Sequence, residues 1–337
     1  MKVLIAGGSG YIGRHLSDSL LRDGHEVVVL TRGQARSGPP GVRMVPWDPR
    51  SADGPWVSEL SGCDGIINLA GASIGSWPWT RRRMAEILSS RLAATTAIVN
   101  GIERTPRDRR PAVLVNASGI DYYGDRGDEV VNEESSPGNS FLARVCQQWE
   151  TVASGAEPLG VRVVRVRTAM VVGRGAPAFR LLILPFRLFA GGPLGNGRQW
   201  FTWIHVDDLV GLYRLALEND GLSGPVNAVA PDIRPEREVA REIGDVLHRP
   251  AIAPAPALVL RLALGEQSHL LLDGRRALPA KAQSVGFEFR LGSLRQALEA
   301  ALAIRLDKYT DLCKDGKRCR PSSLSRSPPC AHPGSSP

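Results

Sequence analysis

The chain has 337 residues, 43% of them hydrophobic, which suffices for a sizeable core in one large domain or two medium ones. Its apolar runs are too short for a membrane span, and an apolar strand pattern follows Met1 directly, which argues against a leader peptide. The formal net charge is +8, but half of it lies in residues 304–337, where no helical or strand period is present. We expect a disordered tail there, and a cytoplasmic protein without nucleic-acid or membrane partners.

Strand and helix patterns alternate through the first half of the chain. The expected strands are residues 2–6, 26–31, 65–69, 112–117 and 162–167. The expected helices are residues 12–23, 80–101 and 143–157. Strands separated by helices in this way predict an α/β fold with a Rossmann-type, doubly wound parallel sheet.

The second half of the chain is less regular. An apolar segment, 181–190, ends at a run of glycines, and further helical patterns cover 204–217, 236–247 and 294–304, with a short strand at 226–229. We predict a dinucleotide-binding domain over 1–175, to which 201–230 return. A smaller C-terminal substrate lobe then comprises 176–200 and 231–303, and 304–337 form the tail.

Three glycines stand between the first expected strand and the first expected helix. Gly7, Gly10 and Gly13 form a GxxGxxG pattern. One glycine permits the tight turn, one lets the backbone approach a pyrophosphate, and one lets helix and strand pack closely. The free N–H groups of the helix start then bind phosphate. A glycine-rich turn without a ligand is the alternative.

The end of the second expected strand distinguishes two nicotinamide cofactors. An NAD site places Asp or Glu there, whereas this chain has Thr31 and Arg32, with Arg36 nearby. Arginine pairs with a 2′-phosphate through charge-assisted hydrogen bonds, so the sequence favours NADP(H). The alternative for Arg32 is a solvated loop charge. Asp48 either lies under the adenine or is a turn residue.

Several longer motifs together resemble a known family. They are GGSGYIG at 7–13, NLAG at 68–71, YYG at 122–124, VRTAMVVGRG at 166–175, WFTWIHVDDL at 200–209 and LLLDGRRALPAKAQSVGFEFR at 270–290. The chain resembles the extended short-chain dehydrogenases/reductases, and among them the sugar-nucleotide-epimerase-like subgroup called epimerase family proteins. The resemblance covers Met1 to about Ala303. It implies an NADP(H)-dependent oxidoreductase or epimerase with a small or nucleotide-linked substrate of unknown identity.

The cofactor contacts expected from the motifs and the resemblance come from four segments. They are Gly7, Ser9, Gly10, Tyr11, Ile12, Gly13, Thr31, Arg32, Leu69, Ala70, Gly71, Glu86 and Arg91. The small residues after Asn68 let a dinucleotide lie against backbone, although a turn or helix start has the same composition. In the subgroup a Ser-Arg pair lies near the cofactor, which here is Ser90–Arg91. Glu86 is either a cofactor contact or a solvated helix charge.

The catalytic pair of the wider family is missing. Short-chain dehydrogenases use a tyrosine and a lysine four residues apart on a helix, where the lysine lowers the tyrosine pKa. None of the tyrosines has a lysine at that spacing, and Phe141 and Val145 occupy the two positions. We therefore keep two functions open: an enzyme with another proton donor, and a non-catalytic NADP-binding redox sensor or accessory protein.

Three side chains are candidates for the missing chemistry. Ser118 ends the fourth expected strand, where it can hold a substrate oxygen, and Tyr123 is expected at the mouth of the same site as a proton donor. His205 can serve as an acid or base, or can cap the helix that follows it. Trp200 and Trp203 are expected to line a substrate pocket. No metal site is predicted, and the oligomeric state stays open, a homodimer included.

Overall fold

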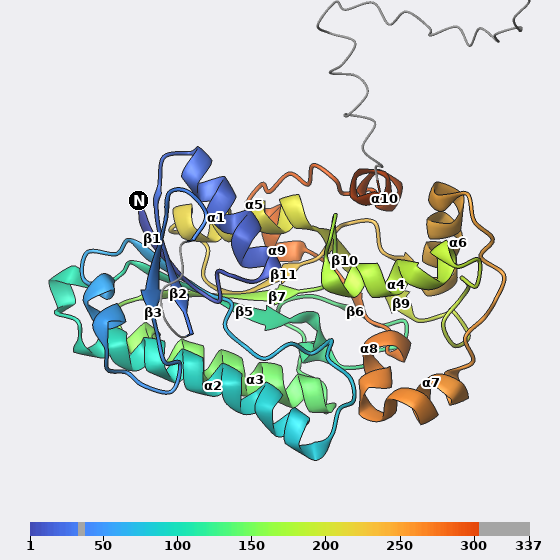
Figure 1. Ribbon diagram of the computed structural model, residues 1–337, viewed down its shortest axis with the longest axis horizontal. Helices are drawn as coiled ribbons and strands as arrows, with labels where there is room; N and C mark the ends of the chain where they lie inside the picture. The colour runs from blue at the N-terminus through green and yellow to red at the C-terminus, as the bar shows by residue number, and fades with distance from the viewer. Residues whose placement is uncertain (33–37, 303–337) are drawn as a thin grey trace, which may run out of the picture. The chain divides into compact units, whose positions relative to one another are not determined.

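Seven parallel strands form a single sheet in the order β11-β7-β5-β4-β1-β2-β3 (Figure 1). The structure is a computed structural model that describes residues 1–32 and 38–302. The strands are β1 (Lys2–Ala6), β2 (Glu26–Thr31), β3 (Val42–Pro46), β4 (Gly65–Asn68), β5 (Val113–Gly119), β7 (Arg162–Thr168) and β11 (Gly224–Ala228). The predicted fold class is thereby confirmed.

The strand order reverses beside β1. The chain first adds β2 and β3 on one side of β1 and then places β4 on the other side, with Ala6 paired to both Leu30 and Asn68. In open α/β sheets, ligands bind at such a switch point, outside the carboxyl ends of the strands. This crevice is where the glycine pattern lies.

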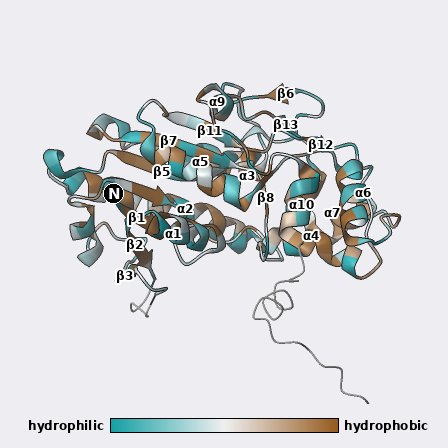
Figure 2. Ribbon diagram, turned by 90° about the horizontal axis from the view of Figure 1, so that it is seen from above, coloured by the Kyte–Doolittle hydropathy of each residue, from teal (hydrophilic) through white to brown (hydrophobic). Residues whose placement is uncertain are grey.

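Helices cover both faces of the sheet because alternate strand residues point to opposite sides. On one face, α1 (Tyr11–Arg22) and α5 (Val206–Glu218) pack on Val3 and Ile5. On the other, α2 (Arg81–Arg104) and α3 (Phe141–Ser154) cover Leu4 and Ala6. Figure 1 shows the first pair above the sheet and the second below it. In Figure 2, the central strands of the sheet are largely brown, the colour of hydrophobic residues.

A third hydrophobic cluster lies beyond the sheet. It joins α4 (Pro177–Arg187), α6 (Glu236–Leu247) and α10 (Leu294–Leu302) around Trp203. Three small pairs of strands lie outside the seven-stranded sheet: β8 (Met170–Val172) with β10 (Trp203–His205), β9 (Trp200–Phe201) with β12 (Arg234–Pro235), and β6 (Val130–Val131) with β13 (Arg276–Ala277). The remaining helices are α7 (Ala257–Leu264), α8 (His269–Leu272) and α9 (Ala280–Ser284).

The structure departs from the sequence prediction at a few elements. Strand β3 was not expected, because this edge strand carries the exposed Arg43 and mixes polar with apolar residues. Helix α3 begins at Phe141, two residues earlier than predicted, since Ser140 caps it by accepting a hydrogen bond from the Ala143 N–H at 3.1 Å. The predicted tail, 304–337, lies outside the described residues. Among the described residues, no helix is long and apolar enough to cross a membrane.

Candidate functional site

The glycines between β1 and α1 are required by the local backbone. Gly7 has φ +79°, and a Cβ atom there would lie 2.9 Å from the carbonyl carbon and oxygen of Leu69. A Cβ on Gly13 would lie 2.5 Å from the Cα of Gly8. Only glycine fits both positions, so the loop lies tightly against the end of β4 and against the first turn of α1.

Among the described residues, no side chain caps the N–H groups in the first turn of α1. Its N-cap is Gly10, which offers no side-chain hydrogen bond, and the first turn holds no acidic residue. Ser9 and Gly10 are exposed, while Tyr11 and Ile12 are half-buried. A helix start of this kind binds anions through its N–H groups and its partial positive charge.

Tyr11 ties this loop to a distant segment. Its hydroxyl donates to the carbonyl oxygen of Arg174 at 3.1 Å, and its ring packs edge-on against His15. Burial, with the nearby Asp207 carboxylate, raises the pKa of Tyr11 to about 12. The phenol therefore stays protonated and acts as a fixed donor between the two segments.

The end of β2 presents a basic side chain. Arg32 follows Thr31 directly and is exposed. Residues 33–37, including Arg36, lie outside the described residues. Asp48 is exposed and accepts a hydrogen bond from the Arg50 N–H at 2.9 Å, which is the geometry of a turn residue. The turn interpretation of Asp48 is thus confirmed.

Hydrogen bonds fix the end of β4. The buried Asn68 side chain donates to Thr95 Oγ1 at 2.9 Å and to Asn116 Oδ1 at 2.7 Å, and it accepts from the Ala70 N–H at 3.1 Å. Leu69 and Ala70 remain half-buried, and Gly71 is exposed. The backbone after β4 is therefore held in a set shape beside the phosphate loop.

Arg91 reaches this segment from α2. Its Nη1 donates to the carbonyl oxygens of Ala72 and Ile87, both at 2.9 Å, and its guanidinium lies over the Trp149 ring. Burial lowers the pKa of Arg91. No carboxylate pairs with it among the described residues, so it offers positive charge to an anion. The neighbouring Ser90 accepts from the Ala72 N–H at 2.9 Å.

Glu86 lies one turn of α2 further out. Its side chain is exposed, and it pairs with Arg83 at 2.8 Å on the helix surface. This position matches the solvated helix charge that the sequence left open. A contact between Glu86 and a cofactor stays a prediction.

Ser118 and Tyr123 belong to one buried network. Ser118 donates to Glu150 Oε1 at 2.7 Å, and Arg167 binds the same carboxylate with two hydrogen bonds of 2.9 Å. Arg167 also donates to the Tyr123 hydroxyl, which donates in turn to Asn227 Oδ1, both at 2.8 Å. We call Ser118, Glu150, Arg167, Tyr123 and Asn227 the buried network.

The expectation that Tyr123 lies at the mouth of a site is wrong. Its side chain is 0% exposed, and Ser118 is 6% exposed. Burial raises the pKa of Tyr123 to about 12, against the opposite influence of Arg167. Sequence reasoning missed Glu150 and Arg167, because a buried charge pair between a helix and a strand leaves no pattern in either segment.

His205 is a helix cap. Its Nδ1 accepts a hydrogen bond from the Asp207 N–H at 3.2 Å, at the start of α5, and the side chain is 4% exposed. Burial lowers its pKa, which favours the neutral ring that such a cap requires. Of the two interpretations of His205, the structural one is confirmed.

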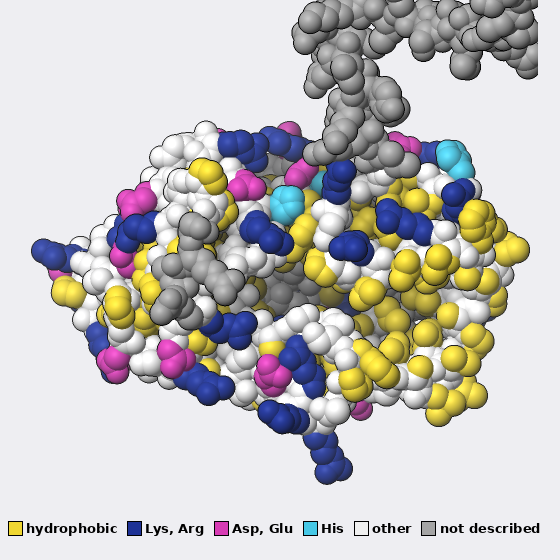
Figure 3. Space-filling model, in the orientation of Figure 1, with side chains coloured by type: hydrophobic (Ala, Val, Ile, Leu, Met, Phe, Trp, Pro, Cys, Tyr) yellow, Lys and Arg dark blue, Asp and Glu magenta, His cyan; other side chains and the backbone are white. Residues whose placement is uncertain are grey.

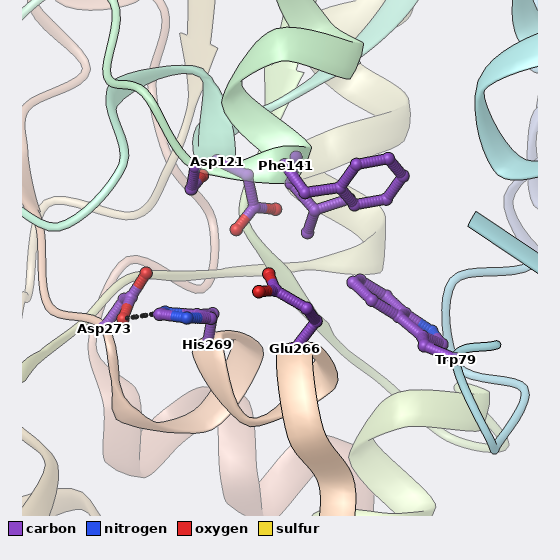
Figure 4. A pocket seen from close by; sticks show the side chains of 8 residues that line it. Trp79, Asp121, Phe141, Glu266, His269 and Asp273 are labelled. Carbon is purple, nitrogen blue, oxygen red and sulfur yellow. Dashed lines mark hydrogen bonds and ion pairs between the residues drawn. The ribbon is translucent and has the colours of Figure 1, made fainter. Parts of the chain in front are cut away.

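A pocket opens at the start of α3, where the family's tyrosine would stand. Its lining residues come from five segments of the chain (Figure 4): Trp79, Asp121, Ser140, Phe141, Leu142, Glu266, His269 and Asp273. The rings of Trp79 and Phe141 meet edge to face, with centroids 5.7 Å apart. Figure 4 shows the carboxylates of Asp121 and Glu266 directed toward each other across the pocket. Val145 is buried below it.

Two predicted pocket residues lie elsewhere. Trp203 is 0% exposed and donates from Nε1 to the Asp232 carbonyl oxygen at 2.7 Å, while Trp200 donates to Asp128 at 2.8 Å. Neither residue lines the pocket at the start of α3, and the fully buried Trp203 cannot line any pocket. For the half-buried Trp200, a contact with substrate stays a prediction. The pocket residues after α7, by contrast, were missed: no motif covers Glu266 or His269, and the motif at 270–290 contains Asp273 without marking it as a site residue.

Basic and apolar side chains gather on different parts of the surface near the pocket. Figure 3 shows a hollow in this face, with basic side chains at its edges and apolar side chains gathered to its right. The exposed apolar residues belong chiefly to α4 and α7: Leu181, Leu184, Leu258, Val259 and Leu262. No group of three or more His, Cys, Asp or Glu residues suited to a metal is found within 1–32 and 38–302.

Comparison with known proteins now identifies the family. Residues 3–229 match the model of the NAD dependent epimerase/dehydratase family. The chain belongs to this family. Residues 255–301 match a second model, described as a domain of unknown function, DUF1731. That second segment supplies three of the pocket side chains, Glu266, His269 and Asp273.

Similar members of the family include proteins from plants, animals and bacteria. An epimerase family protein of Arabidopsis thaliana, the chloroplastic SDR39U1 homologue, is 37% identical over 90% of this chain and 87% of its own length. The crystal structure of human epimerase family protein SDR39U1 with NADPH is 33% identical, with a TM-score of 0.81, over 90% of this chain and 99% of that one. A nucleoside-diphosphate sugar epimerase from Corynebacterium glutamicum is 30% identical, with a TM-score of 0.72, over 93% of this chain and 61% of that one.

Proposed function

We propose that the protein is an NADP(H)-dependent oxidoreductase or epimerase acting on a small or nucleotide-linked substrate. The observation that carries this proposal is the presence of two features in one fold. A phosphate-type loop lies at the switch point of the sheet, and a pocket with polar and aromatic walls opens at the start of α3. The first feature fits a dinucleotide, and the second fits a substrate beside it.

The residues at the start of α1 and at the end of β2 fit the phosphate groups of NADP(H). The N–H groups of the α1 start would hold the pyrophosphate, since no side chain caps them and the Gly7 and Gly13 positions leave no room for a Cβ atom. Arg32 would pair with the 2′-phosphate, since it is exposed at the end of β2. The NADPH in the human relative's crystal structure supports the same choice.

The pocket indicates the kind of group that enters it. Bound NADP(H) supplies hydride transfer at C4 of the nicotinamide. Carboxylates such as Asp121 and Glu266 accept hydrogen bonds from hydroxyl groups, and they disfavour a phosphate at the same place. The rings of Trp79 and Phe141 offer apolar faces. The chemistry of these walls matches a hydroxylated, uncharged part of a substrate, such as the hydroxyl groups of a sugar.

Turnover of a defined panel tests this proposal. The panel holds UDP-glucose, UDP-glucuronic acid and UDP-N-acetylglucosamine with NADP⁺, and small ketones and aldehydes with NADPH. Absorbance of the reduced nicotinamide reports net oxidation or reduction, and chromatography of the sugar nucleotides reports epimers. We expect turnover of at least one member. Tight NADPH binding without any turnover would contradict an enzymatic role.

A second function is favoured by one observation. Phe141 and Val145 occupy the positions of the family's catalytic tyrosine and lysine. The hydroxyls of Ser118 and Tyr123 donate their hydrogen bonds within the buried network. A non-catalytic NADP-binding redox sensor or accessory protein would have these features. It predicts strong thermal stabilisation by NADPH and no turnover across the same panel.

A further inference from the structure

The pocket contains groups that can move a proton, although the residues at the family's tyrosine and lysine positions on α3 cannot. Reduction of a carbonyl, or oxidation of an alcohol, transfers a proton at the substrate oxygen as well as a hydride at carbon. Phe141 carries no exchangeable proton, and Val145 is buried and apolar. The opposite wall, from η5 (Gly265–Ser268) to the strand β13, carries Glu266, His269 and Asp273.

A buried arginine organises the acidic groups of this wall. Arg275 is 7% exposed, donates to Asp121 Oδ1 at 2.8 Å, and lies 3.8 Å from Asp273 Oδ2. Its Nε donates to the Gly124 carbonyl oxygen at 3.0 Å. The two aspartates are therefore held in place by a common cation, with Asp273 between Arg275 and the histidine ring.

His269 is oriented by Asp273. Its Nδ1 lies 2.9 Å from Asp273 Oδ1, the interaction drawn in Figure 4, and half of the ring is exposed. A carboxylate at Nδ1 fixes the proton there and leaves Nε2 as the acceptor. Within residues 1–32 and 38–302, Nε2 has no hydrogen-bond partner. Glu266 is exposed as well, but no described side chain orients its carboxylate.

We propose that His269, positioned by Asp273, exchanges the proton with the substrate hydroxyl in the pocket beside Phe141. In oxidation, the hydroxyl O–H bond breaks and its proton passes to Nε2, while the hydride leaves the same carbon for NADP⁺ and a carbonyl forms. In reduction, the imidazolium N–H bond breaks and its proton goes to the oxygen, as NADPH delivers the hydride to the carbon. This proposal rests on the proposed function, which supplies the redox partner.

His269→Asn, with His248→Asn as the matched control, provides the test. His248 is exposed at the end of α6 and does not line the pocket. The assay uses the panel member that the wild-type protein turns over fastest. We expect His269→Asn to lower kcat about 10²- to 10⁴-fold, the usual contribution of a positioned acid or base. Its melting temperature and its Kd for NADPH should equal those of the control.

The positioning role of Asp273 requires a separate readout. Asp121, Glu266, Asp273 and Arg275 are the charged groups around the ring, and Asp273 is the one in contact with it. Asp273→Asn should lower kcat while leaving KM and the Kd for NADPH close to the wild-type values, because the imidazole ring loses the carboxylate that orients it. Asp273→Glu should restore part of the wild-type kcat.

The outcomes separate the two proposals. If the wild-type protein turns over no panel member, the proposed function falls and this inference falls with it. If the wild-type protein is active and His269→Asn has the kcat and pH profile of His248→Asn, only the assignment of His269 is overturned. A reduced kcat with unchanged NADPH binding and stability supports it.

Discussion

The buried network and the pocket share one short segment and yet differ in how their polar groups are used. Helix η3 (Ile120–Tyr123) contributes Tyr123 to the network and Asp121 to the pocket. In the network, both oxygens of Glu150 accept from Arg167, and the Tyr123 hydroxyl both donates and accepts. In the pocket, the Glu266 carboxylate and the Nε2 of His269 have no partner among residues 1–32 and 38–302.

This difference separates structural from chemical roles. A buried polar group whose hydrogen bonds are all made rigidifies the fold, and it has nothing left to offer a ligand. A polar group in an open pocket with unused capacity is available to one. We therefore infer that Ser118 and Tyr123, whose hydroxyls are hydrogen-bonded within the buried network, support the fold rather than the chemistry.

The largest expected effect comes from breaking the network. Glu150→Gln leaves Arg167, which is 3% exposed, without its counter-charge, and should destabilise the protein by about 3–5 kcal/mol. The control is Glu299→Gln, which breaks an exposed pair with Arg295 and should cost about 0–1 kcal/mol. Urea unfolding measures both. Equal losses would show that the network does not hold the fold.

Glu236 is a buried carboxyl outside the network, and unlike Glu150 it has no arginine partner among the described residues. Glu236 is 4% exposed and accepts one hydrogen bond, from the Leu194 N–H, and burial raises its pKa to about 7. The folded protein therefore binds the proton more tightly than the unfolded chain does. Its contribution to stability is complete below about pH 4.5 and is lost as the pH rises through about 7.

Glu236→Gln removes this dependence. At pH above about 7 the variant should be more stable than the wild-type protein by roughly 2–3 kcal/mol, because a neutral amide carries no desolvated charge. Glu238→Gln, an exposed neighbour on α6, is the control and should leave the pH dependence intact. Melting temperatures of the variants and the wild-type protein, measured from about pH 4.5 to above about pH 7, report this dependence. An unchanged slope in Glu236→Gln would contradict the raised pKa.

Arg32 probes the charge offered to the cofactor. Arg32→Ala should weaken NADPH binding by about 1–3 kcal/mol, the scale of a charge-assisted hydrogen bond, and should leave NADH binding unchanged. Arg50→Ala, also exposed, is the matched control. Calorimetric titration of both nucleotides measures the effect. Equal NADPH affinity in the two variants would remove the preference for NADP(H).

Tyr123→Phe tests whether Tyr123 has a structural or a catalytic role, and its expected effect on stability is the smallest of the series. The variant loses one hydroxyl between Arg167 and Asn227 and should lose about 1 kcal/mol of stability. Turnover of the active panel member should stay at the wild-type rate, because the hydroxyl is fully buried. A large fall in kcat with intact folding would return Tyr123 to the catalytic set.

The sequence predicted the features that depend on local pattern. Alternating strand and helix periods predicted the sheet, and the glycine spacing predicted the loop that Gly7 and Gly13 form against β4 and α1. The edge strand β3 was missed because it is short and places the exposed Arg43 among apolar residues. Features that depend on tertiary contact were also missed. The Glu150–Arg167 pair joins two residues that are 17 positions apart in the sequence. The pocket brings together Asp121 and His269, which lie in distant parts of the chain.

A crystal structure of the NADPH complex tests the central claim most directly. We expect pyrophosphate oxygens within hydrogen-bond distance of the N–H groups at the start of α1, the 2′-phosphate at Arg32, and the nicotinamide at the pocket between Phe141 and His269. A nicotinamide placed away from that pocket, or a pyrophosphate away from the Gly7–Gly13 loop, would contradict it.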